Sequence, residues 1–188
     1  ALAAGVHVFS EKPMATKFNE AKQILAATKT AKGIYQIGHN RRFAHVYKYC
    51  KAQIDSGFGV TSACIKMNRG ELKNPPWVSN AAVTGGFLYE TTVHLLDMAR
   101  YLMGDIAEIE CKGASRVYEQ VDNFAMLITF KSGTFATFHS CAHTSWAFPF
   151  ERIELYGEHR QIVTEEMEKV SHSRGLGQEI ILRDYFQL

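Results

Sequence analysis

The apolar and polar pattern of the first forty residues predicts one parallel strand–helix–strand crossover. Residues 6–9 form an apolar, β-branched run typical of a buried parallel strand, and Pro13 ends it because proline cannot donate to a strand ladder. Apolar residues at helical spacing then run from a Thr16 N-cap to Gly33, and residues 34–37 form a second strand. This order predicts the end of a doubly wound α/β domain.

The pattern changes to a mixture of helices and long β-rich runs after residue 40. Helices are predicted at 43–56 and 87–103, with a loop at 72–84 between them. Strands are predicted at 60–67, 106–118, 123–130, 134–146 and 152–156. Consecutive strands without intervening helices indicate a large, mostly antiparallel open sheet. The expected fold is therefore the remnant of one domain in residues 1–40 and an α+β domain in residues 41–188, whose tail after Glu165 shows no clear element.

Composition and charge exclude several classes of protein. The 188 residues are 46% hydrophobic and 21% charged, which is typical of a folded globular chain. A net charge of +2 without a basic run argues against nucleic-acid binding, and no apolar run is long enough for a membrane span. Four separated cysteines without a C-x-x-C pair favour a reducing cytoplasm over a disulfide framework or zinc knuckle.

The chain starts inside an apparent element. Residues 1–4 are typical of the last turn of a helix, with Gly5 as its C-cap, and no methionine precedes them. We therefore expect an N-terminal region to precede this chain.

Candidate chemistry lies in one predicted helix and at one strand end. Glu90, His94 and Asp97 share a helix face, and a carboxylate beside a histidine is the arrangement of a general acid/base. Lys12, fixed by the following proline, can polarise a carbonyl or bind a hydroxyl. The alternative interpretation is that the helix face is simply exposed to solvent and that Lys12 is a solvated surface lysine, in which case none of these residues has a catalytic role.

Three motifs occur in order over residues 1–157. They are Glu11-Lys12-Pro13 after an apolar strand, then Gly38-His39-Asn40-Arg41-Arg42-Phe43, then Gly85-Gly86-Phe87-Leu88-Tyr89-Glu90-Thr91-Thr92-Val93-His94-Leu95-Leu96-Asp97. With this order and spacing, the chain resembles the glucose–fructose oxidoreductase/inositol dehydrogenase (Gfo/Idh/MocA) family. The resemblance implies a Rossmann domain followed by an α/β domain whose open sheet packs against another subunit. It also implies NAD or NADP as cofactor, a sugar, polyol or inositol-like substrate, and a homo-oligomer.

Residue roles follow from the same resemblance. His94 is the expected acid/base, with Glu90 orienting its ring and Lys12 stabilising the substrate oxygen. The cofactor side is expected to comprise Glu11, Lys12, Pro13, Asn40 and Arg41, and the substrate side Lys12, His94 and Asp97. For Arg41 and Arg42, a salt bridge at the domain boundary is an equal alternative, and the resemblance suggests that the Lys12-Pro13 bond is cis.

Two departures from the family pattern stand out. Glu90 occupies the position where the family usually has Asp, one methylene shorter. No G-x-G-x-x-G follows a strand, and Gly175-Leu176-Gly177 is typical of a turn instead. We therefore expect this chain by itself to bind dinucleotide poorly and to be inactive.

Rival interpretations remain open. The domain could be a non-catalytic binding or oligomerisation module, because an open sheet alone needs no catalytic residues. A hydrolase using the His–carboxylate pair is less consistent with the chain, because no G-x-S-x-G occurs.

His139, Cys141 and His143 alternate along a strand but are more typical of sheet surface than of a metal site, so no metal is expected. Trp77 and Trp146 are candidates for a substrate wall or for packing. Convergence of Lys12 and His94 on one cleft would favour the oxidoreductase.

Overall fold

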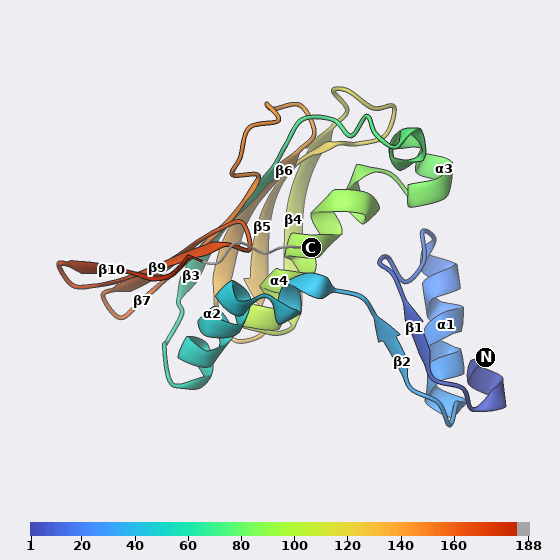
Figure 1. The fold of residues 1–188 in the computed structure, drawn as a ribbon, viewed down its shortest axis with the longest axis horizontal. Helices are drawn as coiled ribbons and strands as arrows, with labels where there is room; N and C mark the ends of the chain where they lie inside the picture. Colours follow the sequence, from blue (N-terminus) through green and yellow to red (C-terminus); the bar gives the residue numbers. More distant parts are fainter. Residues whose placement is uncertain (184–188) are drawn as a thin grey trace.

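The N-terminal part of the molecule is a strand–helix–strand unit. The computed structural model describes residues 1–183, and Figure 1 shows this unit, in blue, beside the larger sheet. A 3₁₀ turn, η1 (Leu2–Ala4), ends at a left-handed Gly5 and is followed by β1 (Val8–Ser10), α1 (Phe18–Thr30) and β2 (Tyr35–Ile37). Strands β1 and β2 pair in parallel, which confirms the predicted crossover. The predicted N-cap was wrong: Lys17 occupies that position and makes no side-chain cap.

The remaining elements form one helical layer and one sheet. The helical segments are η2 (Asn40–Phe43), α2 (His45–Asp55), η3 (Pro76–Ser79), α3 (Ala81–Thr84), the π-helical turn η4 (Leu88–Thr92) and α4 (Val93–Met103). The strands are β3 (Ser62–Asn68), β4 (Ile106–Ala114), β5 (Asn123–Phe130), β6 (Phe135–Cys141), β7 (Glu151–Gly157), β8 (Arg160–Glu165), β9 (Lys169–Arg174) and β10 (Gly177–Arg183).

The sheet has eight strands in the order β10-β9-β8-β7-β3-β6-β5-β4. Only β3 and β6 pair in parallel, so the predicted large, mostly antiparallel open sheet is confirmed. Helices α2 and α4 pack on one face of it (Figure 1). The core between them includes the fully buried Tyr47, Leu95, Met98, Ile128 and Ile153, and most of the opposite face has no covering layer.

The polar tail contains a strand hairpin that the sequence did not reveal. Strands β9 and β10 extend the sheet beyond β8, and Gly175 turns between them as expected for that segment. Polar side chains in β9 are buried through specific partners: the ring Nδ1 of His172 lies 2.8 Å from the hydroxyl of Tyr49. Such a strand has no simple apolar alternation. The last five residues assigned to the 41–188 domain lie outside the described residues.

None of the helices in the described part of the chain is long and apolar enough to cross a bilayer.

Candidate functional site

A cavity of about 520 Å³ lies at the junction between the two parts of the chain. Its lining comes from the carboxyl ends of β1 and β2, from η2, and from the helix that starts at η4: Phe9, Glu11, Lys12, Gly38, Asn40, Arg41, Phe43, Glu90 and His94. Lys12 and His94 thus face the same cavity, as the oxidoreductase interpretation requires. Sequence reasoning missed Phe9 and Phe43, whose apolar side chains carried no chemical signal although Phe43 ends the second motif.

Lys12 is held across the junction by Glu90. Its ammonium Nζ lies 3.3 Å from the Glu90 carboxylate Oε1 and also donates to the Glu90 backbone carbonyl. Both side chains are largely buried, with 16% and 23% of their surface exposed. The Lys12-Pro13 peptide bond is cis. Lys12 is therefore a well-positioned cation rather than a solvated surface lysine.

The expected Glu90–His94 pair is not formed. The Glu90 carboxylate binds Lys12 and the hydroxyl of Thr91, and His94 Nδ1 is buried without a hydrogen-bond partner among the described residues. A charged ammonium is a stronger hydrogen-bond donor to a carboxylate than a neutral imidazole is, so the Glu90 carboxylate binds Lys12 rather than His94. The prediction that Glu90 orients the imidazole was wrong for this reason.

A π-helical turn places Glu90. The turn follows Gly85 and Gly86, whose φ angles of 81° and 89° favour glycine. Within it the N–H of Val93 bonds to the carbonyl of Leu88, so the α-helical spacing used in the sequence argument does not apply. Thr92 then anchors the helix to the sheet, its Oγ1 lying 2.7 Å from Ser140 Oγ on β6.

His94 is a neutral imidazole. Burial lowers the pKa of its ring to about 2, with further lowering from the cations Arg41 and Lys12 and from His39. A neutral ring has a lone pair that can accept a proton. His94 is thus in the protonation state that a general base requires, although a pKa this low makes the ring by itself a weak proton acceptor.

Asp97 and Arg42 lie beside a neighbouring cavity instead. Arg42 donates from Nε and Nη2 to the Asp97 carboxylate at 2.7 and 2.5 Å, and His39 Nδ1 lies 3.7 Å from the same group. These residues line a separate cavity of about 530 Å³. Asp97 is therefore not among the residues that line the Lys12 cavity. Both of its oxygens bind Arg42, which argues against the predicted role in binding substrate.

Arg41 lines the main cavity but its guanidinium is engaged elsewhere. It binds Glu151, a carboxylate with only 1% of its side chain exposed, at 2.7 to 2.8 Å, and Tyr47 donates to the other oxygen at 2.8 Å. Of the two interpretations of the arginine pair, the structure favours ion pairs at the domain boundary. Arg41 anchors η2 to β7.

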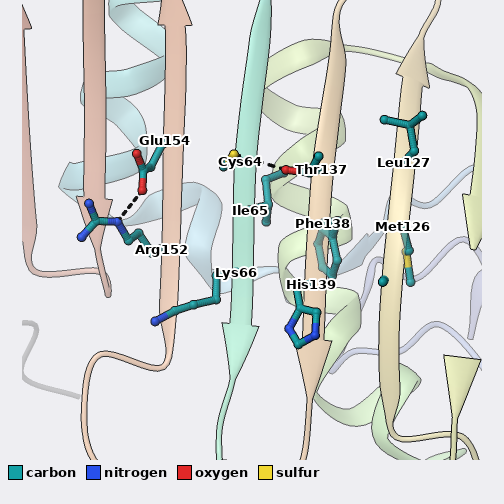
Figure 2. Close-up of a pocket in the computed structure, with 11 residues that line it drawn as sticks. Cys64, Ile65, Lys66, Met126, Leu127, Thr137, Phe138, His139, Arg152 and Glu154 are labelled. Carbon is teal, nitrogen blue, oxygen red and sulfur yellow. Dashed lines mark hydrogen bonds and ion pairs between the residues drawn. The ribbon is translucent and has the colours of Figure 1, made fainter. Parts of the chain in front are cut away.

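The outer face of the sheet carries a second cavity, of about 540 Å³ (Figure 2). Arg152 and Glu154 pair with each other there, and His139 bonds Asn68 rather than joining Cys141, which is buried. No group of three or more His, Cys, Asp or Glu side chains in residues that the structure describes could hold a metal ion. Trp146 donates to the carbonyl of Glu71 at 3.0 Å, which indicates packing between loops.

Comparisons with known proteins agree with this architecture. Residues 1–39 match the model of the oxidoreductase family with an NAD-binding Rossmann fold, and residues 49–163 match the model of the GFO/IDH/MocA C-terminal domain. The match of residues 1–39 confirms the expected cofactor class, a nicotinamide dinucleotide.

Individual relatives share this architecture. The chain is 29% identical to an uncharacterized oxidoreductase, YrbE, of Bacillus subtilis over 80% of the chain and 46% of that protein. It is 27% identical to myo-inositol 2-dehydrogenase of Thermotoga maritima over 88% and 51%, so the chain spans about half the length of these relatives. A levoglucosan dehydrogenase solved with NADH and L-sorbose superposes with a TM-score of 0.82 at 20% identity, over 95% of this chain and 55% of that one, which shows a shared fold.

The buried Arg41–Glu151 pair leads to a prediction about stability. Replacing Arg41 by Met leaves the Glu151 carboxylate buried without its cation, and we expect the free energy of unfolding to fall by about 3–5 kcal/mol. Chemical denaturation measures this loss. Arg100→Met is the matched control, because Arg100 pairs with Asp105 at the exposed surface and should cost less than about 1 kcal/mol. Equal losses in the two variants would contradict the anchoring role of Arg41.

The neutral His94 leads to a prediction about pH. The folded-state pKa of about 2 lies far below the ordinary 6.5, so between these values the unfolded chain binds a proton that the folded chain does not. Stability therefore falls as the pH falls below about 6.5. From about pH 7 to about pH 5, we expect the chain to lose about 2 kcal/mol more than its His94→Asn variant, measured by urea denaturation. His39 and His172, whose pKa values are also lowered by burial, are common to both proteins. Parallel pH profiles would show that His94 is protonated in the folded chain.

Proposed function

The chain belongs to the GFO/IDH/MocA oxidoreductase family, and from that premise we propose that its protein transfers hydride between NAD or NADP and a CH–OH group. The proposed substrate is a sugar, a polyol or an inositol-like compound. Names of the relatives support this class, because they include inositol dehydrogenases from several bacteria. The observation that carries the proposal is that Lys12 and the neutral His94 face one cavity at the carboxyl ends of two parallel strands.

The residues around the cavity suit the cofactor and the substrate at the same time. Glu11, Pro13 and Asn40 belong to the segments that follow β1 and β2, where a nicotinamide ring would be held. When bound, the nicotinamide supplies the hydride acceptor. The chain's own residues then need only position the substrate and move its proton.

A proton route follows from the geometry. His94, being neutral, accepts the proton of the substrate hydroxyl as the carbon–hydrogen electron pair leaves as hydride and the carbonyl forms. The Lys12 ammonium stabilises the oxygen as negative charge develops on it. Glu90 positions Lys12 through its carboxylate and its carbonyl, so that its role is to hold the cation rather than the imidazole.

The rival interpretation as a purely non-catalytic module is less well supported. An interface needs neither a buried neutral histidine nor a lysine clamped beside it in a cavity, and both are present. Catalysis and sheet-mediated assembly are compatible, because the cavity and the bare sheet face lie on different parts of the fold.

Activity tests these roles directly in the protein that carries this chain. We expect His94→Ala and Lys12→Met each to lower kcat for NAD(P)-dependent polyol oxidation by about a hundredfold or more, because each removes a group that acts in the transition state. His143→Ala, at an exposed histidine outside the cavity, is the control and should retain full turnover. Unchanged kcat for either cavity variant would remove that residue from the proposed mechanism.

We also propose that the outer sheet face joins two copies of the chain. Leu127 and Phe135 are 41% and 49% exposed on the adjacent strands β5 and β6. Leu127 lies beside Thr137 on the face of the sheet that no helix covers (Figure 2). The acidic Glu108 and Glu110 lie on the edge strand β4 of this face, beside the apolar strip. A two-fold axis makes such an interface self-complementary, so that the apolar strip of one copy would face that of the other.

A charge introduced on this face tests the assembly. Leu127→Glu places a carboxylate in the apolar strip next to Glu110, and we expect dimer dissociation to become easier by about a hundredfold or more. Sedimentation or light scattering over a concentration series measures the shift. Leu176→Glu, in the exposed β9–β10 turn, is the matched control and should leave assembly unchanged. A monomeric parent chain, or equal behaviour of the two variants, would contradict the proposed interface.

A further inference from the structure

Strand β4 forms one edge of the eight-stranded sheet (Figure 1). Among the residues that the structure describes, it pairs with β5 on one side and with no strand on the other. Residues 107–113 are all exposed, and the apolar Ile109 is 44% exposed. The backbone N–H and C=O groups on the free side of such an edge lack strand partners, so a long exposed edge readily receives another strand.

Charged side chains often keep other strands away from an edge, but on β4 they carry both signs. Glu108, Glu110 and Lys112 alternate along the strand, so they share one face. This is the outer face of the sheet, because Glu110 lies opposite the exposed Leu127 of β5. None of the three has an ion pair within the part of the chain that the structure describes. Two acidic groups and one basic group in a row therefore remain available to charges on another chain.

Few registers allow β4 to pair with β4 of a second copy. Two copies related by a two-fold axis perpendicular to the sheet run antiparallel, and directly opposite residues lie on the same face. Because the faces alternate along a strand, the axis passes beside a residue and not between two residues. An axis beside Cys111 places Glu110 opposite Lys112 of the second copy, and symmetry forms this pair twice. An axis beside Glu110 or Lys112 sets that residue against its own copy. An axis beside Ile109 sets Glu108 against Glu110.

We propose that β4 pairs antiparallel with β4 of a second copy, in the register centred on Cys111, so that two sheets join edge to edge. Opposite charges directly across two strands stabilise the pairing, and like charges destabilise it, so the charged row selects this register. In the same register Ile109 lies opposite Gly113, which has no side chain to obstruct it. This interface extends the sheet, whereas the outer-face contact proposed above stacks one sheet on another. It does not depend on the proposed reaction.

Cys111 is a direct probe of the register. In an antiparallel pair the Cα atoms of opposite residues lie about 4.5–5.5 Å apart, which is within the range of a disulfide. Cys111 lies opposite Met126, which packs against the core, so it is on the helix-covered face and stacked outer faces do not bring two copies of it together. Cys64 is the other exposed cysteine, and Cys50 and Cys141 are buried.

Cross-linking therefore tests the proposal in the intact chain. The Cys64→Ser chain is oxidised with copper phenanthroline, and covalent dimers are measured by denaturing electrophoresis without reductant. We expect a dimer to form through Cys111 and to be absent from the Cys64→Ser/Cys111→Ser chain.

The charged row is tested in the same Cys64→Ser background. Lys112→Glu places acidic groups opposite each other, and we expect the initial rate of cross-linking to fall about tenfold or more. The exchange Glu110→Lys/Lys112→Glu sets opposite charges across the strands again and should restore the rate. Lys32→Glu makes the same change of charge at an exposed lysine outside the sheet and should leave the rate unchanged.

Three results would overturn the proposal. The first is a yield of dimer no greater than that of the chain without Cys111, which would mean that the edge is free or is covered by something else. The second is a cross-linking rate that Lys112→Glu leaves unchanged, and the third is an exchange variant that remains as slow as Lys112→Glu. Thermal unfolding checks that each variant keeps the fold. The cross-link itself is measured with the charged row intact, so it tests the pairing even if a charge variant unfolds.

Discussion

The candidate site depends on the contact between Lys12 and Glu90. Lys12 stands at the end of a parallel strand in the N-terminal unit, and Glu90 stands in the π-helical turn of the second domain. One ammonium binds both the carboxylate and the backbone carbonyl of Glu90, so the two parts of the chain are fixed at this point. The cavity, its cation and the nearby imidazole are all arranged around that contact.

Three ion pairs between a cation and a carboxylate neutralise the charges at and beside the junction. Lys12 pairs with Glu90 across the junction, whereas Arg41 with Glu151 and Arg42 with Asp97 tie the segment after β2 to the rest of the sheet domain. The cations are therefore compensated, and His94 is left among them without a carboxylate of its own. Burial and the neighbouring positive charges keep its ring neutral, which is the protonation state that a base requires. The same pairs that fix the junction and the segment after β2 thus set the charges around His94.

Much of this arrangement was predictable from the sequence, because it depends on strong local patterns. The strand–helix–strand unit and the antiparallel sheet follow from apolar periodicity, and the convergence of Lys12 and His94 was expected from the resemblance carried by the three motifs. The partner of Glu90 and the place of Asp97 did not follow, because helical spacing shows which residues share a face and not which cations approach that face from elsewhere. Strands β9 and β10 were missed because the polar side chains of that tail, such as the buried His172, gave no apolar period.

The most direct test of this account is the protonation state of His94 in the folded chain. Histidine side chains labelled with ¹⁵N report the charge of each ring by nuclear magnetic resonance, and the His94→Asn variant assigns the signal. The account predicts that the His94 ring stays neutral as the pH is lowered through about 6.5 to about 5, while exposed histidines become charged. A His94 ring that titrates with the exposed histidines would contradict the buried, cation-flanked base on which the proposed mechanism depends.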